Sequence, residues 1–471
     1  MVGIVAYGVY IPVYRLRLED VAAAWGGGAG RGEKAVANFD EDSVTMAVAA
    51  GRECLQGMDK GSIDGLYFAS TTSPYREKQA STLVATVLDL RKEIQTADYT
   101  DSLRAATSAI KAAEDAIGSG SAKRILVLAS DCRLGVPGSE YEQTFGDGAV
   151  AFLIGDTDVT ASIEGNYSIA NEFVDLWRAE DDSYVKTWED RFVLSQGYAK
   201  NVSDAVSGIL SKYQLSLADF TKAVFYGPDA RSHDRLIKSL GFETITKSPN
   251  PLFSTVGNSG TAFAPMMLAE ALEEAKTGDK ILFADYGDGS DAFIFTITDR
   301  IGKAKSGRGV KGHIESKRLL PNYHKYLRFR SLLPSDTPRR PAYTTSVPQL
   351  WRDRRQVLSL HGHRCKHCGT VQFPMQRVCI KCQTKDQFDE VELADKPGIV
   401  FTYTLDFLVP SPDPPAIMTF IDFEGGGRIL CAMTDADPGE VKIGMTVEMT
   451  SRRLHERGGI HNYFWKCRPV R

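Results

Sequence analysis

Two pairs of cysteines lie close together in the last third of the chain. Cys365 and Cys368 form one C-x-x-C pair, Cys379 and Cys382 form a second, and ten residues separate the pairs. Each pair can present two thiolates to one ion, and two pairs complete a tetrahedron. Because sulfur would take all four positions, the spacing predicts a structural zinc site. Two disulfides are the alternative. Three nearby histidines could each replace a ligand: His361, His363 and His367.

The overall composition is that of an ordinary globular protein. Of 471 residues, 43% are hydrophobic and 25% are charged, and the formal net charge is −4. This charge gives no general attraction to nucleic acid or to acidic membranes. The N-terminal residues lack the basic start and apolar stretch of a signal peptide, and no window offers the ~18 consecutive apolar residues of a membrane span. We therefore expect a cytoplasmic protein with reduced thiols and no membrane partner.

Short β-rich segments alternate with Ala-rich amphipathic segments up to about residue 300. The helix-like segments are 43–58, 102–120 and 261–278. The strand-like segments are bounded mostly by Gly, Asp or Ser: 65–70, 124–130, 149–155, 222–227, 280–287 and 292–299. A helix, a strand, a GDG turn and a second strand follow one another in this order twice. The pattern predicts an α/β fold with a duplicated core, whose halves we place at 1–165 and 166–300.

After residue 300 the pattern changes. Segment 301–345 is rich in Lys and Arg, which fits equally a solvated linker or a surface that lies against polyanionic phosphates, such as those of coenzyme A. Segment 346–395 holds the cysteine pairs and is expected to be a rubredoxin-like zinc ribbon. Segment 396–471 contains five β-rich stretches, which predict a small all-β barrel of the OB type. OB barrels often bind nucleic acid, but the many acidic residues and the lack of a basic aromatic stripe disfavour that partner.

Four phrases of the core carry a resemblance: FGDGAVAFLIG (145–155), DLWR (175–178), VGNSGTAF (256–263) and YGDGSDAF (286–293). In this order and spacing they resemble the thiolase superfamily, in particular the archaeal-type 3-hydroxy-3-methylglutaryl-CoA synthase family. The ribbon and barrel are similar to a domain that accompanies thiolase-like enzymes in acyl-CoA metabolism, usually on a separate chain. The resemblance implies a five-layer α/β core, a homodimer and CoA thioesters as substrates. A separate thiolase chain is a further candidate binding partner.

The resemblance also implies a cysteine nucleophile at the start of a buried helix and a glutamate base, and the sequence departs at both positions. The cysteine position falls on Leu103, which follows Ser102. The glutamate position falls in the stretch 71–75, which contains no acidic residue, and Glu77 comes a few residues late. Leucine cannot attack a thioester, and a serine hydroxyl needs an adjacent base to do so.

The third catalytic group of the family, a histidine, is expected directly after the strand at 222–227. Tyr226 occupies this position, and His233 follows a helical turn or two later. His233 is either a proton carrier or an exposed surface residue. Only the family's asparagine is retained, as Asn258 in the VGNSG phrase.

These departures favour carbon–carbon bond chemistry without an acyl-enzyme. An aldol or retro-aldol step on a β-hydroxyacyl-CoA needs an oxyanion site and a proton carrier. Asn258 and backbone amides fit the first role, and Tyr226, Tyr99 or His233 fit the second. The sequence is similar in this respect to some thiolase-like aldolases that have lost the cysteine and use tyrosines.

Two alternatives stay open at this point. One is a condensing acyltransferase of the synthase type, with Ser102 as its nucleophile. The other is a catalytically silent acyl-CoA-binding scaffold for a partner thiolase. A thiol such as Cys132 or Cys54 at the end of the substrate tunnel would restore ordinary condensation.

Overall fold

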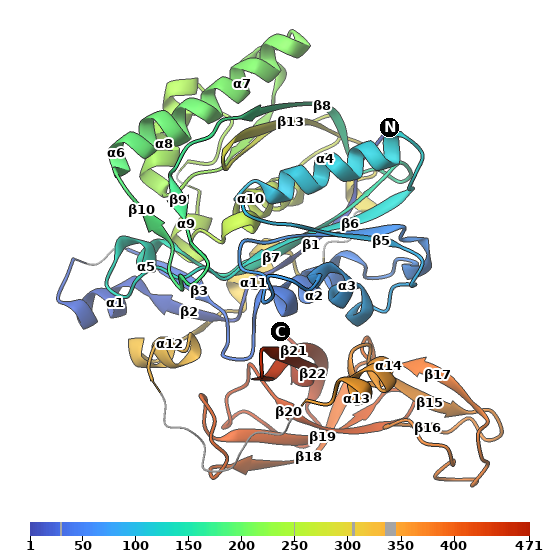
Figure 1. Ribbon diagram of the computed structural model, residues 1–471. Helices are drawn as coiled ribbons and strands as arrows, with labels where there is room; N and C mark the ends of the chain where they lie inside the picture. The colour runs from blue at the N-terminus through green and yellow to red at the C-terminus, as the bar shows by residue number, and fades with distance from the viewer. Residues whose placement is uncertain (29–30, 249, 304–306, 335–344) are drawn as a thin grey trace. The chain divides into compact units, whose positions relative to one another are not determined.

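The computed structural model describes residues 1–28, 31–248, 250–303, 307–334 and 345–471 (Figure 1). The chain divides into two compact units. Unit 1 contains Met1–Ala37, Asp42–Ala85 and Leu90–Tyr326. Unit 2 contains Asn38–Glu41, Thr86–Asp89 and Leu327–Arg471. The predicted α/β core lies in unit 1, and the predicted ribbon and barrel lie in unit 2.

In the part of the chain that the structure describes, unit 1 is built on one nine-stranded mixed sheet. The β4–β5, β4–β6 and β11–β12 pairs are parallel, and the other pairs are antiparallel. Most of these strands are buried on both faces, which explains their continuous apolar runs. In spatial order the strands are β11 (Lys222–Phe225), β12 (Lys280–Tyr286), β13 (Gly289–Ile297), β8 (Ala161–Ala170), β1 (Gly3–Tyr10), β7 (Gly148–Gly155), β6 (Arg124–Asp131), β4 (Gly65–Ala69) and β5 (Gln95–Tyr99).

Four helices make the main contacts with this sheet. The helices are α2 (Ser43–Cys54), α4 (Ala105–Gly118), α7 (Lys200–Tyr213) and α10 (Phe263–Glu273). Both α2 and α4 contact β6 and β7, and Figure 1 shows them on opposite sides of these strands. In the second half, α7 contacts β8 and β13, whereas α10 contacts β11 and β12. Since α4 is followed by β6 and β7, and α10 by β12 and β13, the duplicated core predicted from the sequence is confirmed.

Shorter elements complete unit 1. Two small sheets have the orders β14-β2-β3 and β10-β9. Their strands are β2 (Tyr14–Arg17), β3 (Glu33–Val36), β9 (Leu176–Trp177), β10 (Lys186–Thr187) and β14 (Arg318–Leu319). The other helices are α1 (Leu18–Trp25), α3 (Ala80–Val87), α5 (Glu140–Thr144), α6 (Asp190–Phe192), α8 (Ala230–Leu240), α9 (Leu252–Thr255), α11 (Gly309–Glu315) and α12 (Tyr323–Phe329). The last residues of α3 and α12 belong to unit 2. The single-turn and π segments are η1 (Lys60–Ser62), the π-helix η2 (Val193–Ala199), η3 (Leu217–Asp219), η4 (Gly260–Ala262) and η5 (Ile301–Lys303).

Unit 2 contains a small three-stranded sheet and a closed five-stranded barrel, in agreement with the predicted ribbon and OB barrel. In the barrel strands, buried and exposed residues alternate, as expected for strands with one face inside. The ribbon elements are α13 (Val347–Arg352), α14 (Arg354–Val357), β15 (His361–Cys365), β16 (Val371–Gln372) and β17 (Phe388–Glu392). The barrel strands are β18 (Gly398–Asp406), β19 (Ala416–Phe423), β20 (Arg428–Met433), β21 (Thr446–Arg457) and β22 (Ile460–Pro469).

The basic segment 301–345 is partly helical, because α11 and α12 lie within it. Its residues 304–306 and 335–344 lie outside the described residues, so its two interpretations stay open. The domain boundaries given above also stay predictions, and β8 runs across the proposed division at residue 165. None of the described helices is both long and apolar enough for a membrane span.

Candidate active site and metal centre

A cavity of about 260 Å³ in unit 1 gathers the polar residues at the ends of several strands. Tyr226 follows β11, Tyr286 ends β12, and Asp175 precedes β9. The π-helix η2 adds Tyr198 and two aliphatic side chains, and the loop before η4 adds Asn258. Because these strands end at neighbouring places, residues far apart in the sequence share one cavity.

Asn258 holds Tyr226 at the centre of this cavity. Its side-chain Nδ2 donates to Tyr226 Oη at 2.9 Å and to the carbonyl of Gly227 at 3.2 Å. Its Oδ1 accepts from Arg133 Nη2 at 2.8 Å and from the backbone N–H of Gly260 at 3.0 Å. The loop reaches this shape because Gly257 and Gly260 have φ values of 82° and 63°, which glycine adopts without strain. The retained asparagine therefore has a fixed orientation.

The phenol of Tyr226 is arranged as a proton donor. Its side chain is 1% exposed, and burial raises its pKa to about 12, although Arg133 and Asn258 both act in the opposite direction. The phenol is therefore neutral at physiological pH. Since Tyr226 Oη accepts the Asn258 hydrogen bond, its own proton is left to donate to a ligand.

A carboxyl–tyrosine pair contributes a second polar group to the same cavity. Tyr286 Oη donates to Asp175 Oδ2 at 2.6 Å. Burial raises the pKa of Asp175, while the Tyr286 hydrogen bond opposes the shift. An aspartate with a raised pKa is a better proton acceptor than a solvated one. Neither residue was singled out from the sequence, although the DLWR and YGDG phrases contain them.

Arg133 is a further functional candidate that the sequence did not reveal. It follows β6, is buried, and stacks over the ring of Phe145 at 4.2 Å from the ring centroid. Its contacts, Asn258 and Phe145, both line the cavity. No motif marks this arginine, and only the fold brings it to the site.

Two of the predicted proton carriers lie outside the lining of this cavity. Tyr99 ends the edge strand β5, with its ring centroid 5.6 Å from that of Tyr67. His233 lies in α8 against Phe253 and is fully buried. The alternative prediction that His233 is an exposed surface residue is therefore wrong. Burial lowers the pKa of His233 to about 4, so the imidazole is neutral. Catalytic roles for both residues stay predictions.

Ser102 lies in the turn before α4 and also does not line the cavity. Its Oγ is buried and has no hydrogen-bond partner among the described residues. The turn packs closely on Gly287, where a Cβ would lie 2.7 Å from Ser102 Oγ and 2.8 Å from the Arg104 nitrogen. Its role as a nucleophile therefore stays a prediction.

Neither scattered thiol of the core lines the cavity. Cys54 is buried in α2, and burial raises its pKa to about 12, which keeps it as an unreactive thiol. Cys132 follows β6, and its backbone N–H donates to Thr72 Oγ1 at 3.0 Å. In the described part of unit 1, the cavity thus contains tyrosines and no thiol.

The four cysteines of the ribbon come together in unit 2. Their Sγ atoms all lie within 4.8 Å of one another, and the described residues contain no other such group of ligand types. The two pairs form similar knuckles. The backbone N–H of Cys365 donates to the carbonyl of Thr370, and that of Cys379 to the carbonyl of Thr384, both at 2.9 Å. The hydroxyls of these threonines lie 3.2 Å from Cys368 Sγ and Cys382 Sγ. The hydrogen bond to Thr384 lowers the pKa of Cys382 to about 5.

The nearby histidines do not join this group. His361 Nε2 lies 2.8 Å from Asp89 Oδ2, and His363 Nδ1 lies 3.0 Å from the carbonyl of Gln376. His367 is exposed. The cysteines therefore provide all four candidate ligands among the described residues.

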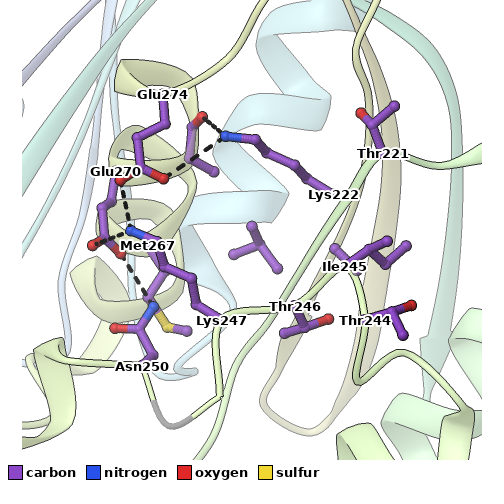
Figure 2. A pocket seen from close by; sticks show the side chains of 13 residues that line it. Thr221, Lys222, Thr244, Ile245, Thr246, Lys247, Asn250, Met267, Glu270 and Glu274 are labelled. Carbon is purple, nitrogen blue, oxygen red and sulfur yellow. Dashed lines mark hydrogen bonds and ion pairs between the residues drawn. The ribbon is translucent and has the colours of Figure 1, made fainter.

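A second cavity of unit 1, of about 290 Å³, lies between β11 and α10 (Figure 2). Lys247 Nζ lies 2.9 Å from carboxylate oxygens of both Glu270 and Glu274. Asn250 donates to Glu270, and Lys222 donates to the carbonyl of Ala271 (Figure 2). These charged groups are paired with one another, so they are not available to bind a reacting ligand. The cavity at Tyr226 is therefore the candidate active site.

Comparisons with known proteins agree with this architecture. The family model "ChsH2, C-terminal OB-fold domain" matches residues 390–452. The hydroxymethylglutaryl-CoA synthase of Methanopyrus kandleri is 33% identical over 343 residues, which cover 70% of this chain and 98% of that protein. The synthase of Methanocaldococcus jannaschii is 33% identical over 341 residues, 70% of this chain and 99% of that protein.

Solved structures show the same fold. A crystal structure of HMG-CoA synthase complexed with CoA matches with a TM-score of 0.62 at 20% identity, covering 69% of this chain and 89% of that one. A structure of MvaS in complex with 3-hydroxy-3-methylglutaryl coenzyme A gives 0.60 at 21% identity, with coverages of 73% and 94%. With a thiolase-like core that spans nearly all of its relatives' length and an OB-fold domain added after it, this chain belongs to the hydroxymethylglutaryl-CoA synthase family of acyl-CoA enzymes.

Proposed function

We propose that this chain makes or breaks a carbon–carbon bond of a CoA thioester as an aldolase acting on a β-hydroxyacyl-CoA, with the Tyr226 phenol as the hydrogen-bond donor to the enolate. Family membership supports a CoA thioester as substrate. The observation that carries the proposal is the Tyr226 phenol, which Asn258 fixes in a cavity lined by no described thiol.

In the cleavage direction, the β-hydroxyl loses its proton as the carbon–carbon bond breaks. The bonding electrons move onto the thioester carbonyl and form an enolate, which is then protonated. Asp175, held by Tyr286, is the candidate acceptor of the hydroxyl proton because burial strengthens it as a base. Tyr226 donates a hydrogen bond to the enolate oxygen, with Asn258 keeping the phenol in position. In the aldol direction the same groups act in reverse.

The test is turnover of β-hydroxyacyl-CoA thioesters by the full-length chain, followed by mass spectrometry of the CoA products. We expect cleavage by the chain alone and a large loss of activity in Tyr226→Phe. Tyr213→Phe is the matched control, because Tyr213 lies at the end of α7 and does not line the cavity. Activity that appears only with a second thiolase chain and survives Tyr226→Phe would instead identify a silent scaffold.

A condensing acyltransferase is the second candidate, and the names of the relatives favour it. This reaction would need an acyl-enzyme, for which Ser102 is the candidate nucleophile. Mass spectrometry after brief incubation with acetyl-CoA separates the two proposals. An acetyl group on Ser102 supports condensation, and an unmodified chain that cleaves its substrate supports the aldolase.

We also propose that the four ribbon cysteines bind a structural zinc ion. Four converging sulfur atoms suit zinc, and they leave no open position for a substrate. Reduced thiols fit the cytoplasmic location that we propose from the sequence. A homodimer remains part of this proposal, and the edge strand β5, which has a strand neighbour only on one side, is a candidate contact.

A further inference from the structure

The peptide groups of Tyr226 are held by hydrogen bonds just past the end of β11. Its backbone N–H donates to the carbonyl of Ala284 at 2.9 Å, which continues the pairing with β12 by one residue. Its carbonyl accepts from Tyr198 Oη at 2.8 Å, in a contact between buried groups. A buried carbonyl needs such a partner, and beyond the strand end a side chain supplies it. The backbone of Tyr226 is therefore fixed on both sides of its Cα.

The phenol of Tyr198 is the donor in this contact, because a carbonyl oxygen carries no proton. The Tyr198 side chain is 2% exposed and lines the cavity. Burial raises the pKa of Tyr198 well above its ordinary value, so the hydroxyl keeps its proton. Removing this hydroxyl would take a donor away from a buried carbonyl, which is costly.

The ring of Tyr198 also supports the two tyrosines of the proposed mechanism. It lies edge-on to the rings of Tyr226 and Tyr286, with centroid separations of 6.2 and 5.6 Å and interplanar angles of 73° and 81°. Edge-to-face contact is a favoured arrangement of aromatic rings. The rings of Tyr226 and Tyr286 lie 6.1 Å apart. One side chain thus contacts both the proposed hydrogen-bond donor and the tyrosine that holds Asp175.

Tyr198 reaches this place from the π-helix η2, which has supporting contacts of its own. Asn201 Nδ2 donates to the carbonyl of Gly197 at 2.6 Å, and Asn201 Oδ1 accepts from Asn171 Nδ2 at 3.0 Å. At Gly197 a Cβ would lie 2.8 Å from Tyr286 Oη, so only glycine lets the turn approach this closely. π-Helices are rare and occur frequently at functional sites. The turn that carries Tyr198 is therefore held without a ligand.

We propose that Tyr198 is a positioning residue, which holds Tyr226 in the place from which its phenol reaches the thioester oxygen. Tyr198 acts through the Tyr226 carbonyl and through ring contact, and it exchanges no proton with the substrate. This inference rests on the proposed function in one respect, because it takes Tyr226 as the hydrogen-bond donor.

The first test is a double-mutant cycle in the full-length chain. Tyr198→Phe removes the hydroxyl and keeps the ring, and kcat for cleavage of a β-hydroxyacyl-CoA should fall about 10- to 100-fold, with KM within about twofold. In a Tyr226→Phe background the same substitution should change kcat by less than about twofold, because the group that it positions is already gone. Tyr213→Phe is the matched control, since the Tyr213 hydroxyl accepts from the N–H of Asn166 and does not line the cavity.

The second test needs no turnover. Acetyl-CoA labelled with carbon-13 at the thioester carbonyl should show a downfield carbonyl resonance when bound, because a hydrogen bond to the oxygen polarises the carbonyl. This shift should become smaller in Tyr198→Phe and disappear in Tyr226→Phe, whereas Tyr213→Phe should retain it. Incorporation of 4-aminophenylalanine at position 198 restores a donor on the same ring and should recover most of the shift. Melting temperatures and free CoA affinity by isothermal titration calorimetry show that each variant is folded.

Three results would overturn the proposal. The first is an equal fold-loss of kcat from Tyr198→Phe in both backgrounds, which is the result expected of a purely structural residue. The second is a carbonyl shift in Tyr198→Phe equal to that of the unaltered protein. The third is a shift that survives Tyr226→Phe, which would also remove Tyr226 from the proposed function. A shift that depends on Tyr198 in a chain without cleavage activity would overturn the proposed reaction and leave this inference standing.

Discussion

The metal centre of unit 2 and the Tyr226 cavity of unit 1 are built in opposite ways. The metal centre takes all its ligands from residues 365–382, and each knuckle closes on itself through backbone hydrogen bonds. The cavity takes its polar residues from the ends of β11 and β12 and from several loops and short helices. Arg133, which contacts the lining residues Asn258 and Phe145, has an Nε without a partner among the described residues. The metal centre is completed by residues close in sequence, which suits a structural role. The Tyr226 cavity keeps unused hydrogen-bonding capacity, which suits reversible binding of a ligand.

Removal of the metal should have the largest effect. Chelation, or the substitution Cys379→Ser, should release about one zinc ion per chain and unfold the ribbon, because structural zinc contributes ~10 kcal/mol or more to such folds. Zinc content by elemental mass spectrometry and hydrogen exchange over residues 346–395 would measure this. Core peptides from unit 1 are the internal control. A chain that holds no zinc and still protects the ribbon would contradict the proposed metal centre.

The substitution Tyr226→Phe should affect only the cavity. Removing one preorganised donor typically lowers kcat by about 10²- to 10³-fold, and the ring that packs against Tyr198 and Tyr286 is kept. The steady-state cleavage rate should therefore fall strongly, whereas the melting temperature should change little. A kcat that stays within twofold would remove Tyr226 from the mechanism.

The substitution Asp175→Asn should change the pH profile. Burial raises the pKa of Asp175, so its carboxylate, the form that accepts a proton, is populated only as the pH rises through that raised value. Activity of the unaltered enzyme should increase over this range. In Asp175→Asn the increase should disappear, and kcat should fall about 10²-fold, within the usual range for general-base catalysis. Asp204→Asn, at an exposed position on α7, should keep the original profile.

The smallest effect concerns the two knuckles. Gly369 has φ 73°, and the corresponding Gln383 has φ 61°, where a side chain is strained. Gln383→Gly should stabilise the zinc-loaded ribbon by about 0.5 kcal/mol, because relief of strain exceeds the entropy that glycine adds to the unfolded chain. Gly369→Gln should destabilise it by a similar amount. Denaturation monitored in the ribbon would test both substitutions. A less stable Gln383→Gly variant or a more stable Gly369→Gln variant would contradict the strain explanation.

The same contrast explains what the sequence could predict. Spacing alone revealed the four cysteines, because both knuckles are local in sequence. The retained phrase around Asn258 and the position of Tyr226 after β11 predicted two residues that do meet. Asp175 and Tyr286 are 111 residues apart, and their hydrogen bond depends on where β9 begins and β12 ends in space. Arg133 carries no sequence signal. What marks it is that its side chain is buried and forms no ion pair among the described residues.

One wall of the cavity depends on the π-helix η2 (Val193–Ala199), which contributes Val193, Leu194 and Tyr198. A π-helix is in effect an α-helical turn with one inserted residue. Deleting that residue would rotate the side chains before it by about 100° relative to those after it. A single-codon deletion in this turn would thus reshape the Tyr226 cavity while the nine-stranded sheet stays the same, so that its shape could change by a short mutational step.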